Sequence, residues 1–277
     1  MNGAVNILKL LKQGDNKWDI GNYKFTEMVT ELNESDIKIA KALDNIGDGE
    51  LSAIGIIVQH QDLVRNYESR EIAKDFYESV MYGFSMINYE EMRHGFIFKE
   101  LASIVKTGKS FIEDVDSSLI HELMFETNEL YKNPYESLIS YLIGEITNVE
   151  LYSSIEKKIE NDKFREIIRN IRKDEQKHKA AWLNMIKRMV KKSNVHKENF
   201  AKAVRDCHFI HQAEISNYFV SGAQSVEHFF TPVVSMTILD EKLRILENIF
   251  GESPLSKKQL FVEFNEYFQD NILKKAV

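Results

Sequence analysis

The motif Glu-x-x-His occurs twice in this chain, as Glu91-Met92-Arg93-His94 and as Glu175-Gln176-Lys177-His178. Both copies lie inside long stretches with the apolar periodicity of a helix. Residues three positions apart share one face of a helix, so each copy directs a carboxylate and an imidazole to the same region. A single copy is usually a solvated surface pair. Two copies, each with a glutamate on the preceding helix, indicate a dinuclear metal site in a four-helix bundle.

The composition of the chain favours long helices. Its 277 residues include only 12 glycines and 3 prolines, and charged residues reach 29%. The hydrophobic content of 43% is enough for one sizeable core. We therefore expect an all-α fold with a single domain over residues 1–277. The bundle core is expected at about residues 35–192, with a C-terminal helical extension at about residues 195–277.

The bundle helices have recognisable ends. The first is expected from a cap at Asn33 or Ser35 toward Tyr67, and the second from Ser69 or Arg70 to Thr107-Gly108. The third is expected to start at Pro134 and to turn at 160–162, where the fourth begins and runs through Val190. Gly47 and Gly49 interrupt the first stretch. A mid-helix glycine costs about 1 kcal/mol relative to alanine, which indicates a packing or bending role.

Two antiparallel helices joined by a short turn bring residues level when they are equidistant from that turn. A turn at residue 160 places Glu145 level with Glu175. A turn between Tyr67 and Arg70 makes Glu50 the best partner for Glu91. His60 and Asp62 fall at the wrong level for the same role.

The two Glu-x-x-His motifs and the two glutamates level with them together give a set of six predicted ligands. Four carboxylates carry a formal charge of about −4, which could not be buried without metal, and two divalent cations would neutralise it. Oxygen and nitrogen ligands without thiolate suit iron or manganese better than structural zinc. The predicted ligands are Glu50, Glu91, His94, Glu145, Glu175 and His178.

The connection over residues 108–133 is long enough to traverse the bundle, and part of it, 117–132, is expected to be helical. The second and third helices can then run parallel, as in ferritin-like topology. The C-terminal extension is expected to contain two or three helices, with breaks near Thr231-Pro232 and Gly251–Pro254.

The two motifs also resemble those of a known family. Residues 89–95 resemble the E-E-x-R-H-G motif of soluble acyl-carrier-protein desaturases, and residues 174–178 resemble their D-E-K-R-H motif. The segments around Glu50 and around Glu145 resemble the helices that carry two further ligands, so the resemblance covers about residues 35–190. It implies that the six residues are iron ligands, with Glu91 and Glu175 as catalytic bridges. Asn148 stands where the family has a catalytic-site threonine.

Two acidic residues are candidates to support the ligands. Glu90 and Asp174 each precede a predicted bridging glutamate and could accept the second N–H of the histidine in the opposite half. The alternative is that both are exposed charges.

These observations predict a non-haem di-iron oxidase or oxygenase that activates O₂ to desaturate or hydroxylate an apolar, acyl or carrier-bound substrate. Two iron ions are expected, with manganese or a mixed pair as the alternative, together with an external electron donor such as a ferredoxin. Iron oxidation or peroxide detoxification, as in ferritins and rubrerythrins, uses the same bundle. Arylamine N-oxygenases share the site design, but have a further histidine where this chain has Ile171. A structural bundle with surface Glu-x-x-His pairs is a third reading.

The net charge, the cysteine content and a group of basic residues indicate which kinds of partner the protein can have. The net charge of −7 argues against nucleic acid as the main partner. The single cysteine, Cys207, excludes an internal disulfide and a centre with four cysteine ligands. We expect a cytoplasmic homodimer without a membrane segment. Cys207, His208, His211 and His228 have a weak metal-binding spacing, for which ordinary helix packing is the alternative. The basic residues Lys187, Arg188, Lys191, Lys192 and Lys197 could dock an acidic carrier or electron donor, or form a solvated helix end.

Overall fold

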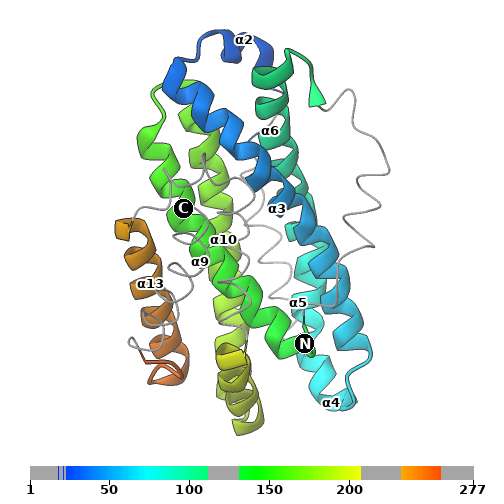
Figure 1. Cartoon of the computed structure of the whole chain (residues 1–277). Coiled ribbons are helices and arrows are strands. Elements are labelled where there is room, and N and C mark those ends of the chain that lie inside the picture. The colour runs from blue at the N-terminus through cyan, green and yellow to red at the C-terminus, as the bar shows by residue number, and fades with distance from the viewer. Residues whose placement is uncertain (1–17, 19–20, 22, 112–130, 207–231, 257–277) are drawn as a thin grey trace, which may run out of the picture. The chain divides into compact units, whose positions relative to one another are not determined.

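The computed structural model describes residues 18, 21, 23–111, 131–206 and 232–256. Every regular element in these ranges is helical, which confirms the all-α class (Figure 1). Residues 194–206 are also helical. The other elements are α2 (Phe25–Thr30), α3 (Glu34–Arg65), α4 (Arg70–Ala73), η2 (Lys74–Phe76), α5 (Tyr77–Tyr82), η3 (Gly83–Ile87), α6 (Asn88–Thr107), α9 (Pro134–Lys158), α10 (Asp162–Lys192) and α13 (Pro232–Phe250).

The chain divides into two compact units. The first comprises residues 1–134 and 155–174, and the second comprises residues 135–154 and 175–277. The division passes through α9 and α10, so each unit contains part of both helices. The single domain over residues 1–277 stays a prediction, as does the ferritin-like arrangement of the bundle.

Helix α3 matches its predicted limits closely. The Asn33 side chain accepts a hydrogen bond from the Asp36 N–H at 2.8 Å, which confirms Asn33 as the N-cap. The helix ends at Arg65 and runs without interruption through Gly47 and Gly49, so the predicted break there is wrong. Each glycine costs only about 1 kcal/mol of helix stability relative to alanine, chiefly in backbone entropy, and the packing of a long helix offsets this cost.

Gly47 has the predicted packing role, because α3 and α6 approach closely at this point. A Cβ atom on Gly47 would lie 3.0 Å from Lys99 Cδ and 3.2 Å from the Gly95 carbonyl oxygen. A Cβ atom on Gly95 would lie only 2.5 Å from Leu51 Cγ, a distance that no packed side chain tolerates. The pair of glycines therefore lets the two helices lie close together just where Glu50 and His94 face each other.

The second predicted helix is less regular than its periodicity indicates. It begins after the cap residue Ser69 and ends at Gly108, whose φ of 74° closes α6, as predicted. Between these ends the 3₁₀ segment η2 and the π-helical segment η3 replace α-helical turns. A π turn contains one extra residue, shifts the side chains that follow it, and often occurs near functional sites. Before α3, residues Phe25–Thr30 form the short helix α2.

Helices α9 and α10 form the predicted antiparallel hairpin. Pro134 is the first residue of α9, and residues 159–161 connect the two helices. The buried Asp36 carboxylate accepts hydrogen bonds from the Glu160 and Asn161 N–H groups, both at 2.9 Å. This carboxylate holds the turn of the hairpin against the start of α3.

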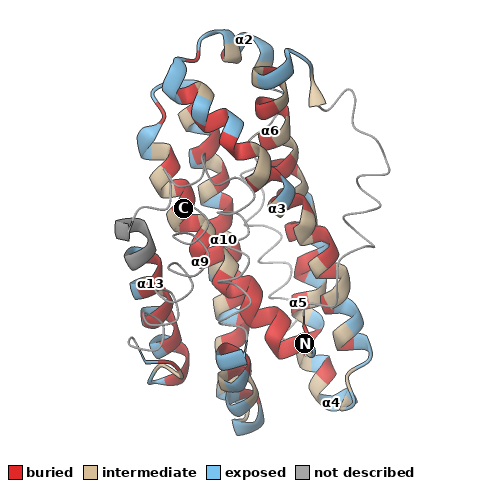
Figure 2. Ribbon diagram, viewed as in Figure 1, coloured by how far each residue is buried: buried red, intermediate tan, exposed pale blue. Residues whose placement is uncertain are grey.

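The C-terminal part contains the predicted breaks. Helix α13 begins at Pro232 and is followed by Gly251, whose φ is 88°. From residue 237 onward, its residues are buried on one side and exposed on the other (Figure 2). The predicted crossover helix at 117–132 lies almost entirely outside the described residues, as does much of the extension. No described helix combines the length and the apolar character needed to cross a membrane.

Candidate metal centre

All six predicted ligands are buried, with exposed fractions between 0 and 5%. They form two triads of the same composition. The first triad, in the first unit, consists of Glu50, Glu91 and His94. The second triad, in the second unit, consists of Glu145, Glu175 and His178. Within each triad, one potential ligand atom from every member lies within 4.8 Å of the others.

The first triad is built by α3 and α6. Glu91 and His94 lie one turn apart on α6, and Glu50 reaches them from α3 across the glycine contact. His94 Nδ1 is 3.7 Å from Glu50 Oε2 and 3.7 Å from Glu91 Oε2. The structure thus places Glu50 at the predicted level. His60 is elsewhere, with its Nε2 2.8 Å from Ser79 Oγ and its ring against Phe76.

The second triad is built by α9 and α10 in the same way. Glu175 and His178 lie one turn apart on α10, and Glu145 faces them from α9. His178 Nδ1 is 3.7 Å from Glu145 Oε1 and 3.9 Å from Glu175 Oε2. The predicted level of Glu145 in this hairpin therefore agrees with the structure.

The residues of each triad fit a metal ion. Distances of 3.7 to 3.9 Å between the imidazole nitrogen and the carboxylate oxygens are too long for hydrogen bonds. Two ligand atoms that each lie about 2.1 Å from one ion are at most about 4.2 Å apart, so these distances suit shared coordination. Two carboxylates and a neutral imidazole carry a charge of about −2, which one divalent cation offsets. Each triad of buried Glu and His side chains could hold a metal ion.

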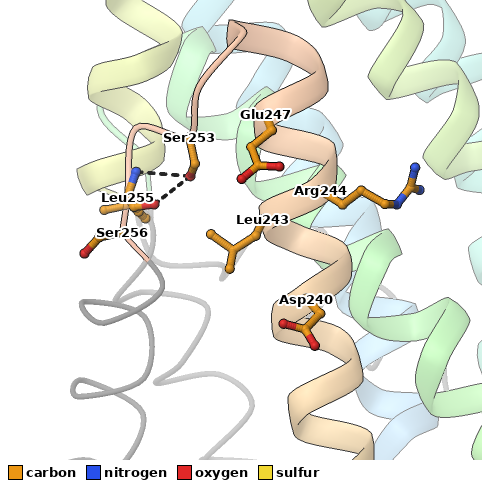
Figure 3. A pocket seen from close by; sticks show the side chains of 7 residues that line it. All are labelled: Asp240, Leu243, Arg244, Glu247, Ser253, Leu255 and Ser256. Carbon is orange, nitrogen blue, oxygen red and sulfur yellow. Dashed lines mark hydrogen bonds between the residues drawn. The ribbon is translucent and has the colours of Figure 1, made fainter.

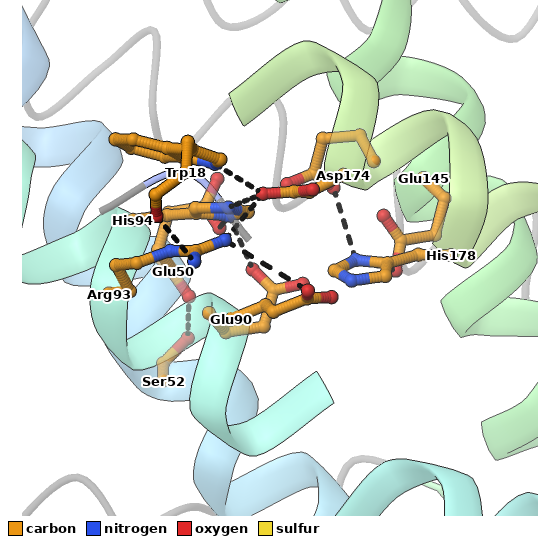
Figure 4. A network of polar contacts seen from close by, with 12 residues as sticks. Trp18, Glu50, Ser52, Glu90, Arg93, His94, Glu145, Asp174 and His178 are labelled. Atoms are coloured by element: carbon orange, nitrogen blue, oxygen red, sulfur yellow. Dashed lines mark hydrogen bonds and ion pairs between the residues drawn. The ribbon is translucent and has the colours of Figure 1, made fainter. Parts of the chain in front are cut away.

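A buried polar network supports the first triad (Figure 4). Asp174 Oδ2 accepts hydrogen bonds from Trp18 Nε1 at 2.8 Å and from an Arg93 amino group at 2.5 Å. The same oxygen lies 3.4 Å from His94 Nε2. With Nε2 facing this carboxylate, the Nδ1 atom of His94 faces Glu50 and Glu91. Asp174 thus fixes the ring orientation in which Nδ1 could bind metal.

Glu90 and Asp174 are both buried, with exposed fractions of 1% and 2%, so the reading of them as exposed charges is wrong. Asp174, next to the second motif, contacts the histidine of the first motif, as predicted. Glu90 lies 3.9 Å from an Arg93 amino nitrogen, so the Arg93 guanidinium lies near two carboxylates. The support of a histidine by Glu90 stays a prediction.

Aromatic side chains support the second triad. Trp182 Nε1 donates a hydrogen bond of 3.3 Å to Glu145 Oε1. The Trp182 ring is fully buried and stacks on the Tyr141 ring with centroids 5.1 Å apart. Asn148, the predicted catalytic residue, lies one turn after Glu145 on α9 and is half-buried.

Sequence reasoning missed the supporting residues Trp18, Arg93 and Trp182. Arg93 lies inside the first motif, and Trp182 lies one turn after His178, so helical spacing could have identified both. Trp18 had no such signal, because 156 positions separate it from Asp174.

Two further predicted features have different outcomes. Cys207, His208, His211 and His228 lie outside the described residues. Among the basic residues at the end of α10 and in the following helix, Lys187 is half-buried, while Arg188, Lys191, Lys192 and Lys197 are exposed. Their docking role stays a prediction.

Comparisons of the chain with protein-family models, with curated proteins and with solved structures give no match. The candidate metal centre is therefore argued from its own residues, their burial and the distances between them.

Proposed function

We propose that the two triads together form one dinuclear iron centre in a ferritin-like four-helix bundle, and that the protein is an O₂-dependent oxidoreductase. The observation that carries the proposal is the repetition of the triad. Two hairpins each bury a Glu-x-x-His pair against a glutamate from the neighbouring helix, with nearly equal nitrogen–oxygen distances. Two such carboxylate–histidine sets inside a helical bundle are typical of dinuclear carboxylate proteins.

The continuity of α10 supports a single centre. Asp174 contacts His94 of the first triad, and the next residue, Glu175, belongs to the second triad. The Cα atoms of neighbouring residues are only about 3.8 Å apart. Glu91 and Glu175 are the proposed bridging carboxylates, because both belong to the Glu-x-x-His motifs.

The protein's own residues hold and orient the metals and limit the access of water. Asp174 keeps a proton on Nε2 of His94, which leaves the Nδ1 lone pair for coordination. Ile143, Ile146 and Ile171 are buried on the helices of the second motif and exclude water. When bound, an iron pair supplies the chemistry of O₂ reduction and of oxidation of a C–H bond. Manganese, alone or with iron, fits the same ligands.

The substrate proposed for this centre is an apolar organic molecule, which is desaturated or hydroxylated. The four electrons required to reduce O₂ to water come in part from the substrate, and an external donor such as a ferredoxin supplies the others. Carrier-bound acyl groups are one candidate class.

The proposal is tested by metal analysis followed by O₂ uptake. We expect about two iron ions per chain after anaerobic loading, and O₂ consumption that depends on a reductant and rises with a suitable apolar substrate. Glu145→Ala and His178→Ala should each lower the iron content. A protein that binds less than about one ion per chain, with no change in either variant, contradicts the dinuclear centre.

Two outcomes would favour a different class of reaction. A very large assembly on gel filtration, with iron oxidation but no substrate oxidation, favours storage or detoxification. Conversion of an arylamine but not of an aliphatic substrate favours N-oxygenation.

A further inference from the structure

The exposed side of the helical stretch from α5 to the start of α6 is apolar. Between residues 75 and 89 five positions are exposed, and four of them carry large apolar or aromatic side chains: Tyr77, Met81, Phe84 and Tyr89. Their exposed fractions are 54, 52, 41 and 52%. The fifth is Ser85, whose hydroxyl donates a hydrogen bond to the Met81 carbonyl oxygen at 2.6 Å and so turns back to its own helix. We call these four side chains the exposed apolar face.

Helix α3, in the same unit, has the usual kind of surface. Every exposed position on it is polar or charged, for example Lys38, Asp48 and Asp62. Single exposed apolar residues are common in soluble proteins, whereas several on neighbouring turns indicate a binding surface. The opposite side of the α5 stretch is already packed, since Phe76 and Ile87 are fully buried. The exposed apolar face is therefore additional to what the core of this unit needs.

The second unit has a surface of the opposite kind. Asp240, Arg244, Glu247 and Ser253 line an open pocket at the end of α13, and most of its lining is polar (Figure 3). Water satisfies polar groups of this kind, so the pocket needs no partner. Water gives no such compensation to exposed aromatic and thioether side chains, which gain free energy when a partner covers them.

The size of the exposed apolar face fits an interface between proteins. An aromatic side chain covers about 150 to 250 Å² when it is buried, so four half-exposed side chains of this kind leave about 400 Å² of apolar surface open. A standard interface buries about 800 Å² on each partner, and somewhat more than half of that area is apolar. The four side chains thus supply most of the apolar part of one standard interface.

The charges beside the face favour a second copy of the same chain as the partner. Between residues 70 and 76 the exposed positions are Arg70, Glu71 and Lys74, which carry both signs. The Lys74 and Glu71 side chains lie 2.8 Å apart and are still 60% and 85% exposed. A strongly charged partner would be recognised by a rim of one sign. In a two-fold dimer each residue of one copy can meet a different residue of the other, so a rim with both signs complements itself.

One end of the exposed apolar face lies close to the first triad. Tyr89 precedes Glu91 by two residues, and its ring centroid lies 5.6 Å from the Arg93 guanidinium, which binds Asp174. A partner that covers Tyr89 would therefore also shield this charged network from water.

We propose that the protein forms a two-fold symmetric dimer through the exposed apolar face, with Tyr77, Met81 and Phe84 of one copy packed against the same side chains of the other. Lys74 and Glu71 lie at the edge of the contact, where each can pair with the opposite charge of the second copy. The inference rests on the exposed side chains alone and holds whichever reaction the metal centre catalyses.

Sedimentation velocity of the full-length protein at micromolar concentrations tests the proposal. The wild-type protein should sediment as a dimer of the 32.3 kDa chain. Met81→Glu and Phe84→Glu should each raise the dissociation constant of the dimer at least about 30-fold, the loss typical of a residue at the centre of an interface, because each buries a carboxylate from both copies. Val195→Glu is the matched control, since Val195 is also 50% exposed but lies on the 194–206 helix, and this variant should remain a dimer.

A wild-type protein that stays monomeric at these concentrations overturns the inference, and so does a dimer that both glutamate variants form as tightly as the wild type. Thermal melts show that the variants are folded, as expected for changes at exposed positions. Co-sedimentation with phosphatidylcholine vesicles is the second measurement. A monomer that binds these vesicles, and loses the binding in Phe84→Glu but not in Val195→Glu, overturns the dimer and assigns the face to a lipid surface.

Discussion

The first and second triads have the same ligand types and nearly the same distances, but they are supported by different kinds of side chain. Around the first, Asp174 accepts hydrogen bonds from Trp18 and Arg93 and contacts His94. Around the second, Trp182 donates to Glu145 and stacks on Tyr141. One support is mainly electrostatic, and the other is mainly aromatic packing.

This difference separates what a motif determines from what its surroundings add. The spacing of Glu-x-x-His on a helix is enough to bring a carboxylate near an imidazole, so both triads have similar geometry. The orientation and basicity of each ligand depend on the groups behind it, which differ between the hairpins. The two triads should therefore respond differently when those groups are changed.

The largest effect is expected from removing one histidine in either half. His94→Ala and His178→Ala should each reduce the bound iron from about two ions to about one or fewer per chain, because a shared centre loses ligands for both ions. Metal analysis after gel filtration measures this. His60→Gln changes a buried histidine outside the triads and should retain the iron. If each alanine variant keeps one tightly bound ion with unchanged affinity, the triads are independent sites.

A second large effect is expected when the pH is lowered, because buried His60 in the first unit makes folding stability depend on pH. Burial lowers the pKa of His60 to about 4, against 6.5 for the free side chain. The unfolded chain therefore takes up a proton between pH 6.5 and pH 4 that the folded chain does not, and folding stability falls over this range by about 3 kcal/mol. Urea unfolding at several pH values should show this loss. In His60→Gln the same range should have a weaker pH dependence, and an unchanged slope would contradict the assignment.

Asp174→Asn tests the electrostatic support of the first triad. The amide cannot hold the His94 N–H as strongly and leaves the buried Arg93 without a full counter-charge. Metal affinity should fall by about 10- to 100-fold, as for other residues behind metal ligands. Competition with a chelator measures the change. Asp162→Asn, at the exposed start of α10, is the control and should have no effect on affinity.

Gly95→Ala tests the close helix contact beneath the first triad. The new Cβ would lie 2.5 Å from Leu51 Cγ, so α3 and α6 must move apart. Overpacking of this kind costs about 1 to 3 kcal/mol of unfolding free energy, and metal binding should weaken with it. Gly251→Ala is a control without a steric neighbour, strained only by its φ of 88°. Equal stability of wild type and Gly95→Ala would contradict the close contact.

The smallest effect is expected from Trp182→Phe in the second triad. Phenylalanine keeps the ring beside Tyr141 but loses the 3.3 Å hydrogen bond to Glu145. Because one ordinary hydrogen bond contributes about 1 kcal/mol, metal affinity should fall by less than about 10-fold. The same competition with a chelator measures this change. A larger loss of metal affinity than in Asp174→Asn would contradict the expected order of the two variants.

Much of the architecture could be predicted because it depends on neighbours in the sequence. Apolar periodicity and the cap residues Asn33, Gly108 and Pro134 placed the helices, and distance from the turn placed Glu50 and Glu145 level with the motifs. These features arise from backbone hydrogen bonds and side-chain spacing within single helices and hairpins. The π segment at Gly83–Ile87 had no such signal, since it arises from packing rather than from a change in periodicity.

The amino-acid sequence alone specified which residue types could form the triads and at which level of each hairpin they lie. The tertiary structure decided which groups stand behind them: Trp18 reaches Asp174 across 156 positions, and Gly95 meets Leu51. The physical reason is that helix periodicity is local, whereas burial and hydrogen bonding across the chain depend on the packing of distant segments.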